Sequence, residues 1–267
     1  MSKYKYILGL GVFMTSLILA SLACKTPNIP NPFATETPTP TLTFTPSPTF
    51  TPSPTATATN TATPTQIPTG VSAEVQSDGT TRLIDYDNKY QIVLPKNWMV
   101  VPITKDAFSV AADKIAKENP KMAETLQAFK NLDPDIFRGI ALLADENYLY
   151  NAYATNLSIS AFKDDTLTSM PLSFISAILE DSFKSSGATI LTNGVNEINN
   201  EHGVEVEYID YEQNLQVNGN SISIHARAIL FQSDGKLIMV QVATPKQFTS
   251  DIFAIAEKIG ASIELLK

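Results

Sequence analysis

The pattern of apolar and polar positions divides the chain into three parts. Residues 1–23 hold one continuous apolar run. Residues 24–70 have no apolar period and consist almost entirely of Thr, Pro, Ser and Ala. Residues 71–267 show periodic apolar positions over about 200 residues, which suffices for one domain with a sizeable core. We therefore expect a signal segment, a stalk and one folded domain.

Strands predominate in the periodic part. Short runs that alternate or are continuously apolar, bounded by turn residues, predict strands. They cover Thr81–Asp85, Tyr90–Leu94, Phe137–Ala144, Asn156–Phe162, Thr189–Thr192, Val204–Glu212, Ile222–Gln232 and Lys236–Ala243. Asp87 and Asn88 lie between the first two runs and favour a hairpin there.

Helical periodicity marks four further segments. They are 106–118, 121–131, the stretch from about Pro171 to Gly187, and about Ser250 to Ala261. The third is the clearest, with an apolar stripe that ends before a glycine suited to stop the helix. Because the helices fall in separate groups among more numerous strands, we predict an α+β fold with a mostly antiparallel central β-sheet flanked by helices.

Side-chain alternation along two late strands predicts a polar sheet face. We interpret Glu205, Glu207, His225 and Arg227 as a set that points outward, while apolar neighbours point into the core. The turn residues Asn218–Gly219 suit a tight hairpin, but that register would pair the apolar face of one strand with the polar face of the other. We therefore expect a bulge or a wider loop between these strands.

The single cysteine of the chain, Cys24, ends the first apolar run in the tetrapeptide Ser21-Leu22-Ala23-Cys24. The residues before Cys24 are arranged as in an export signal, with basic residues first, then an apolar run and then small residues. The tetrapeptide resembles the bacterial lipobox, with Ser21 where Leu is usual. We expect cleavage before Cys24 and diacylation by palmitate-type chains, since two lipid chains give stable anchoring. An uncleaved membrane-spanning helix and plain secretion are the alternatives.

The stalk, residues 24–70, contains a repeated unit, Phe-Thr-Pro-Ser-Pro-Thr, at 44–49 and 50–55. Proline prevents helices and sheets from propagating and favours extended polyproline-II conformers with a reach on the order of 100 Å. We interpret the stalk as a disordered spacer that holds the domain away from the membrane. Docking of a proline-recognising partner and O-glycosylation are alternatives that the composition also allows.

The folded domain is acidic. Residues 1–70 hold three lysines and one glutamate, which leaves the domain 16 basic and 26 acidic residues and a net charge near −10. Such a surface repels phosphate backbones, so nucleic-acid binding is disfavoured. Direct adsorption onto anionic lipid is disfavoured for the same reason. Attachment to the extracytoplasmic face of the cell membrane is therefore expected to depend on the lipid at Cys24.

Candidate catalytic groups are few in the domain. It has no cysteine, which excludes thiol catalysis and thiolate metal sites, and its two histidines are His202 and His225. We expect His202 in a solvated turn and His225 as a cross-strand partner of an acid. The acidic pairs Asp145-Glu146 and Asp164-Asp165 lack the spacing of a calcium loop, and no phosphate-binding glycine loop is present. We expect no metal and no cofactor.

The stretch Tyr90-Gln-Ile-Val-Leu-Pro95-Lys-Asn-Trp98 resembles the opening of the PsbP-like superfamily, in which an apolar strand runs into a Pro-x-x-Trp corner. The order of the later strands and of the C-terminal helix extends the resemblance over most of 81–265. It implies an antiparallel sheet sandwiched by helices, a non-enzymatic role in binding protein partners or supporting membrane complexes, and structural corner roles for Tyr90, Pro95 and Trp98.

Together these observations predict a surface-tethered lipoprotein whose domain binds a protein partner or supports an envelope complex without catalysis. The first alternative is a domain that binds a small ligand or a metal ion in a pocket between sheet and helices. The second is an envelope hydrolase.

Replacing Cys24 with alanine tests the anchor. We expect the variant to lose all acyl labelling and to accumulate as the unprocessed precursor, because the acylated thiol is absent. Metabolic labelling with an alkyne fatty acid and the electrophoretic size of the product provide the measurement. A Cys24→Ala chain of normal mature size that stays in the membrane fraction would contradict lipidation.

Overall fold

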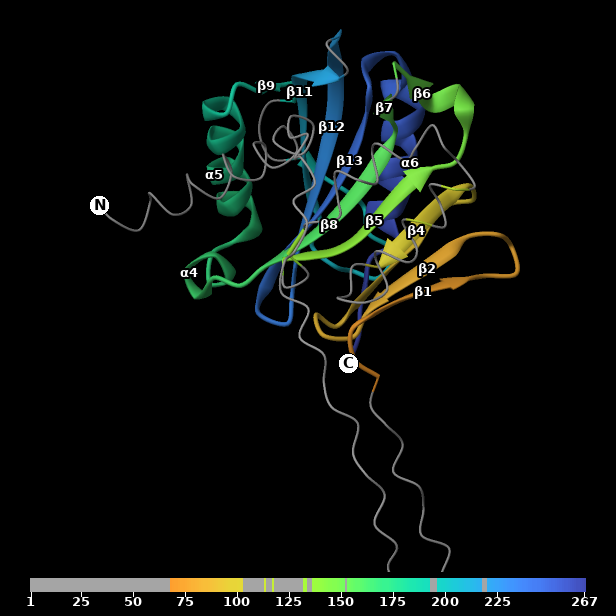
Figure 1. Cartoon of the computed structure of the whole chain (residues 1–267). Helices are drawn as coiled ribbons and strands as arrows, with labels where there is room; N and C mark the ends of the chain where they lie inside the picture. The colour runs from red at the N-terminus through yellow and green to blue at the C-terminus, as the bar shows by residue number, and fades with distance from the viewer. Residues whose placement is uncertain are drawn as a thin grey trace, which may run out of the picture. The chain divides into compact units, whose positions relative to one another are not determined.

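The computed structural model describes residues 68–102, 113, 117, 132–133, 136–151, 153–192, 196–217 and 220–267 (Figure 1). The predicted signal segment, Cys24 and almost all of the stalk lie outside the described residues. So do the Asn218–Gly219 turn and, apart from two isolated residues, the predicted helices at 106–118 and 121–131. The statements below concern the described residues.

An antiparallel sheet of eight strands forms the centre of the domain (Figure 1). Its strand order is β10-β11-β12-β13-β8-β5-β4, and β9 pairs with β11 beside this path. The strands are β4 (Trp98–Pro102), β5 (Phe137–Leu143), β8 (Asn156–Phe162), β9 (Thr189–Ile190), β10 (Asn196–Glu197), β11 (Glu207–Val217), β12 (Asn220–Ser233) and β13 (Lys236–Pro245).

A second antiparallel sheet has four strands in the order β1-β2-β3-β14. They are β1 (Val71–Val75), β2 (Thr81–Asp85), β3 (Tyr90–Leu94) and β14 (Glu264–Leu265). The chain also forms a small hairpin of β6 (Leu149–Tyr150) and β7 (Tyr153–Ala154). The described helices are α4 (Asp165–Thr168), α5 (Leu172–Ser185) and α6 (Thr249–Ala261), with 3-10 turns η2 (Glu146–Tyr148) and η3 (Lys246–Phe248).

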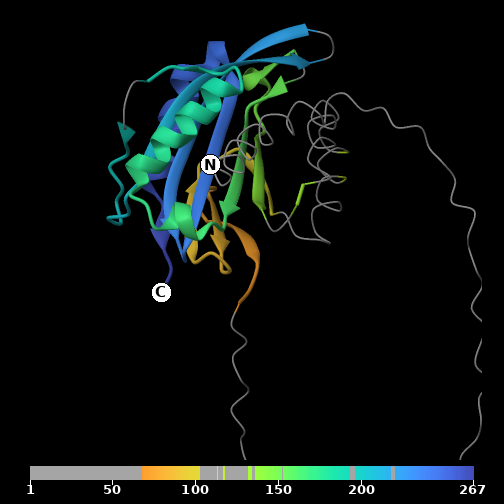
Figure 2. The same ribbon diagram turned by 90° about the vertical axis from the view of Figure 1, so that its left-hand side faces the viewer.

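Two hydrophobic cores lie on the two faces of the large sheet. On one face, α6 and the small sheet pack against β12, β13, β8 and β5, and Ile252 and Ile259 of α6 are fully buried there. On the other face, α5 packs against β11 and β12 (Figure 2), where the ring of Phe183 stacks on Tyr211 with centroids 4.6 Å apart. The strands β11 and β12 are therefore covered on both sides.

The predicted α+β class with a mostly antiparallel sheet flanked by helices is confirmed. The predicted strands Thr81–Asp85, Tyr90–Leu94 and Asn156–Phe162 have the same bounds in the structure. Local alternation was sufficient at these positions, because each strand is bounded by turn residues. The short strands β1, β6, β7, β10 and β14 and the strand β4 were not predicted.

The expected bulge between β11 and β12 is wrong. Their residues pair without a register shift from Glu207 opposite Leu230 to Val217 opposite Asn220. The conflict that motivated the bulge assumed one solvated polar face. Because helices cover both faces, polar residues of these strands are instead buried in pairs. The unbulged register therefore leaves no apolar face of these strands in water.

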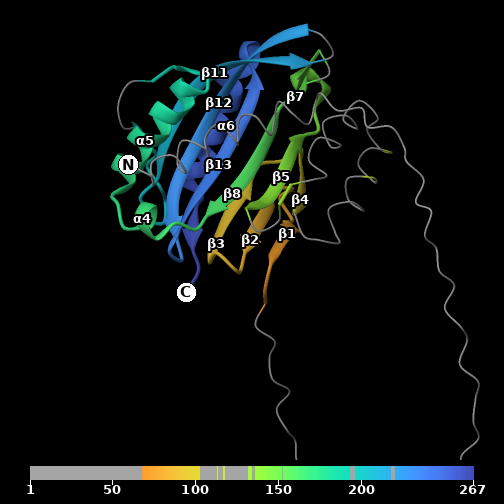
Figure 3. The same ribbon diagram turned by 60° about the vertical axis from the view of Figure 1, so that its left-hand side comes forward.

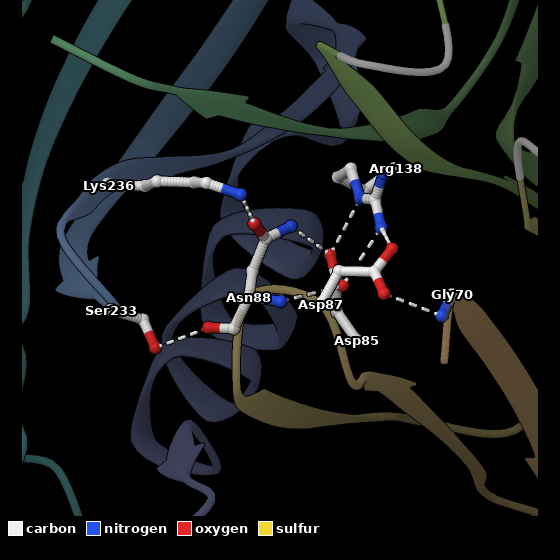
Figure 4. A network of polar contacts seen from close by, with 7 residues as sticks. All are labelled: Gly70, Asp85, Asp87, Asn88, Arg138, Ser233 and Lys236. Atoms are coloured by element: carbon white, nitrogen blue, oxygen red, sulfur yellow. Dashed lines mark hydrogen bonds and ion pairs between the residues drawn. The ribbon is translucent and has the colours of Figure 1, made fainter. Parts of the chain in front are cut away.

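A buried ion pair joins the two sheets. Asp85, at the end of β2, is fully buried, and Arg138 on β5 donates to both of its carboxylate oxygens, from Nε at 2.8 Å and from Nη2 at 3.0 Å (Figure 4). The same Nη2 donates to Asp87 at 2.7 Å. Burial lowers the pKa of Arg138, but these bonds raise it more, so the pKa lies above its usual value. Two carboxylates thus satisfy one guanidinium, as a buried charge requires.

Asn88 extends this ion pair to the turn between β12 and β13. Its backbone N–H and its side-chain Nδ2 donate to Asp85 at 3.1 and 2.5 Å. Its carbonyl oxygen accepts from Ser233 at 2.6 Å, and its Oδ1 accepts from Nζ of Lys236. Burial leaves Asn88 only 1% exposed. These polar contacts therefore hold the β2–β3 turn against the end of the large sheet.

The first described residues attach to the same place. Gly70 donates its backbone N–H to Asp87 at 2.8 Å, and its carbonyl oxygen accepts from Tyr86 at 2.9 Å. The bond from Gly70 is the main reason that the pKa of Asp87 is lowered. We name the set the junction cluster: Gly70, Asp85, Asp87, Asn88, Arg138, Ser233 and Lys236 (Figure 4).

Candidate functional site

The hairpin of β11 and β12 extends past its neighbouring strands (Figures 2 and 3). β9 pairs with β11 only at Tyr211 and Glu212, and β13 pairs with β12 as far as Ile224. In the described part of the chain, residues 213–217 and 220–223 therefore pair only with each other. We name these two segments the arm. Both of its outer edges carry backbone groups without a neighbouring strand.

The two faces of the arm differ in polarity. Leu215, Val217 and Ile222 share one face and are buried. Gln216 and Ser221, which are opposite each other in the register, lie on the other face and are exposed. The arm therefore presents polar side chains and free strand edges, while its apolar side is covered.

A group of polar residues fixes the base of the arm. Ser223 donates to Glu212 at 2.5 Å, and Lys246 of η3 donates to both carboxylate oxygens at 3.2 Å. His225 lies opposite Glu212 in the register, with Nε2 3.4 Å from the carboxylate, and its Nδ1 is 2.9 Å from the hydroxyl of Thr249. We name Glu212, Ser223, His225, Lys246 and Thr249 the base cluster.

Hydrogen bonding within the base cluster favours the charged form of its acid. The bonds from Ser223 and Lys246 lower the pKa of Glu212 more than its partial burial raises it. The carboxylate is therefore an acceptor that holds together β11, β12 and η3, elements separated by up to 34 positions in sequence.

The base cluster combines a hydroxyl, an imidazole and a carboxylate. The direction of their hydrogen bonds, however, is not that of a catalytic triad. Thr249 donates its hydroxyl hydrogen to the carbonyl oxygen of Lys246 at 2.6 Å. Its oxygen therefore accepts from Nδ1 of His225. A hydroxyl nucleophile would have to donate to the imidazole instead. This arrangement joins the arm to the start of α6 rather than activating Thr249.

Arg227, the next charged residue along β12, is held by its cross-strand neighbour. Its Nε and Nη2 donate to the two oxygens of Asp210 at 2.7 and 2.8 Å. The guanidinium also lies 4.0 Å from the ring centroid of Tyr208 and 4.7 Å from that of Phe253 on α6. Bidentate pairing and contact with two rings satisfy the buried charge of Arg227 under α6.

The predicted outward polar set is not brought together. Glu205 precedes β11 and is exposed, whereas Glu207 is 2% exposed on the α5 face. His225 and Arg227 lie on the opposite face, under α6, and are 9% and 7% exposed. The interpretation of an outward face is wrong because helices cover both sides of these strands. The actual partners of Arg227 and His225 are Asp210 and Glu212. They follow from pairing β11 with β12 without a bulge, and the sequence signal for this register was the Asn218–Gly219 dipeptide.

The corner residues of the Pro-x-x-Trp motif lie at the connection from the small to the large sheet. Tyr90 and Trp98 are buried, and the ring of Tyr90 meets Phe231 edge-on with centroids 5.2 Å apart. Pro95 lies between β3 and β4, and Asn97 provides the left-handed turn with φ 70°. These positions are those of core and turn residues.

The remaining candidates for chemistry lie in turns. His202 is exposed. Asp145 accepts from the backbone of Asn147, and Asp164 accepts from the backbone of Thr166, as residues at helix starts do. Among the described residues, no group of three or more His, Cys, Asp or Glu is arranged to hold a metal ion. Within the same residues, no helix has the length and apolar character needed to cross a bilayer.

Comparison with known proteins finds solved structures of low sequence identity. No family model matches the chain, and no curated protein matches it significantly. The solution structure of cyanobacterial PsbP from Synechocystis sp. PCC 6803 is 15% identical, covers 72% of this chain and 95% of that chain, and gives a TM-score of 0.42. The structure of LpqN, involved in cell envelope biogenesis of Mycobacterium tuberculosis, is 10% identical, covers 74% and 91%, and gives 0.38. Membership of the PsbP-like superfamily stays a prediction.

Glu207 is the buried carboxylate with the weakest support. Among the described residues, its side chain accepts a hydrogen bond from the hydroxyl of Ser176 on α5. Burial, together with the charges of Glu205 and Glu197, raises the pKa of Glu207 against the effect of the Ser176 bond. The folded protein therefore binds a proton at Glu207 more tightly than the unfolded chain does. Its stabilising effect is present below the ordinary pKa of 4.5 and is lost as pH rises through the raised value.

Replacing Glu207 with glutamine removes this penalty. We expect the free energy of unfolding of Glu207→Gln to exceed that of the natural protein at pH 7 and the difference to vanish below the ordinary pKa of a glutamate. Urea unfolding at a series of pH values measures both. The exposed Glu257→Gln, on α6, is the matched control and should change stability little. Equal pH dependence in the natural protein and Glu207→Gln would refute the assignment.

Proposed function

We propose that this protein is a non-catalytic binding module tethered to the extracytoplasmic face of the cell membrane. Lipid on Cys24 holds it to the membrane, residues 24–70 act as the spacer, and the arm binds a protein partner. The partner adds a strand or an extended segment to an outer edge of the arm.

The observation that carries this proposal is the unpaired edge of the arm. Backbone N–H and C=O groups on a free strand edge are a template for another strand, and main-chain hydrogen bonds give such contacts their affinity. A protein partner can supply a complementary strand, whereas a small molecule or a metal ion cannot. This favours a protein partner over the small-ligand alternative.

The base cluster supports the proposal because it makes the arm rigid. Glu212 and His225 lie at the last position at which β9 supports β11, and Lys246 and Thr249 tie that position to η3 and α6. A strand edge that is already ordered loses less conformational entropy when a partner binds. The base cluster thus serves binding by fixing the arm.

The placement of the arm agrees with a tethered module. Gly70 belongs to the junction cluster and directly precedes β1, which starts at one end of the domain, and the arm lies at the opposite end (Figures 1 and 2). A domain held at its Gly70 end would present the arm away from its attachment. The acidic domain surface suits a protein partner rather than a nucleic acid.

Site-specific photo-crosslinking in the producing cell tests the proposal. A photoreactive amino acid at the exposed arm position Gln216 should crosslink the full-length chain to one partner protein. The same amino acid at Glu257, an exposed position on α6, is the matched control and should give no such product. A chain truncated after the stalk should also fail to capture the partner.

Two results would overturn the proposal. One is equal crosslinking from Gln216 and Glu257, which would mean that the arm is not the contact. The other is capture of the same protein by the stalk alone, which would assign binding to residues 24–70.

A further inference from the structure

The ε-amine of Lys236 faces the side-chain amide of a buried asparagine. Nζ of Lys236, at the start of β13, contacts Oδ1 of Asn88, which is 1% exposed (Figure 4). The acceptor is a neutral carboxamide rather than a carboxylate. An amine and a carboxamide held in contact are the two reactants of an amide exchange.

A carboxyl group lies on the other side of the same amide. Nδ2 of Asn88 donates to Oδ2 of Asp85 at 2.5 Å, and Asp85 is fully buried. The amide carbon of Asn88 therefore lies between the amine that could attack it and a carboxyl group in contact with the nitrogen that would leave. Figure 4 shows these groups in a line.

The surroundings hold this arrangement fixed. The backbone of Asn88 is bonded to Asp85 through its N–H and to Ser233 through its carbonyl, while Arg138 orients Asp85 from the far side. Tyr90 and Phe231 pack next to each other in the adjoining core. Reactants held in contact gain a high effective concentration, and burial of Asn88 protects its amide from competing water.

We propose that Lys236 and Asn88 become joined by a covalent isopeptide bond. Nζ of Lys236 attacks Cγ of Asn88, a C–N bond forms, and the bond from Cγ to Nδ2 breaks. The lysine nitrogen gives up two protons. One is taken up by the departing Nδ2, which Asp85 holds in place and which leaves as ammonia, and the other is released to water. The reaction needs no oxidant, metal or cofactor.

The bond would link two positions 148 residues apart, in the β2–β3 turn and at the start of β13. It would join the two sheets covalently at the end of the domain where Gly70 lies. A cross-link over so long a loop restricts the unfolded chain as a disulfide does. The domain contains no cysteine, so this bond would take the place of a disulfide in an exported protein.

Peptide mapping of the purified full-length protein by mass spectrometry tests the proposal. We expect one branched peptide that contains both Asn88 and Lys236, with a mass lower by one ammonia than the sum of its parts. Peptide-level analysis gives this result whether or not Cys24 is processed.

Lysine variants separate the bond from other losses of ammonia. Lys236→Arg keeps the charge but cannot form the bond, so the branched peptide should disappear. Lys89→Arg, at a neighbouring exposed lysine that pairs with Asp234, is the matched control and should retain it. Separate, full-mass peptides from the natural protein would overturn the proposal. So would a loss of ammonia at Asn88 that persists in Lys236→Arg, since that would be a local succinimide.

Discussion

The Asp85–Arg138 ion pair is the interaction on which the arrangement of the domain depends. Removing two charges from water costs several kcal/mol each, and a buried pair offsets this only when its remaining lone pairs and protons are also bonded. Here every requirement is met by a different element: β5 supplies Arg138, the β2–β3 turn supplies Asp87 and Asn88, and the β12–β13 turn reaches Asn88 through Ser233. Movement of either sheet would leave a buried charge without a partner, so the pair fixes their relative position.

The same physical rule explains the other polar residues of the interior. Arg227 is paired with Asp210 and lies against two rings, and Glu212 accepts from Ser223 and Lys246 at the base of the arm. Each pair joins a strand to a neighbouring element that apolar packing alone would allow to slide. Glu207 is the contrast, since Ser176 gives it little compensation and like charges surround it. The domain thus combines two apolar cores with polar clusters that determine register, attachment of the ends and orientation of the arm.

Local patterns in the sequence predicted most of the fold and little of the candidate site. Alternation and turn residues identified β2, β3, β8 and α5, because these elements are bounded by strong local signals. Short strands such as β10 and β14 have no such signal and form only because a neighbouring strand is present. The prediction of the site was wrong for a similar reason. Whether His225 faces water or a helix depends on the packing of α6, which no local pattern around His225 shows. Asp85 carried no motif at all, and its burial follows from its distant partner Arg138.

A double-mutant cycle between Asp85 and Arg138 tests this account most directly. It should be measured in the Lys236→Arg background, in which no cross-link can contribute, using Asp85→Asn, Arg138→Met and both changes together. We expect a coupling free energy of about 3 kcal/mol or more, because each single change leaves a buried group without its partner. A coupling of about 0–1 kcal/mol, as exposed ion pairs give, would contradict the claim that this pair holds the two sheets together.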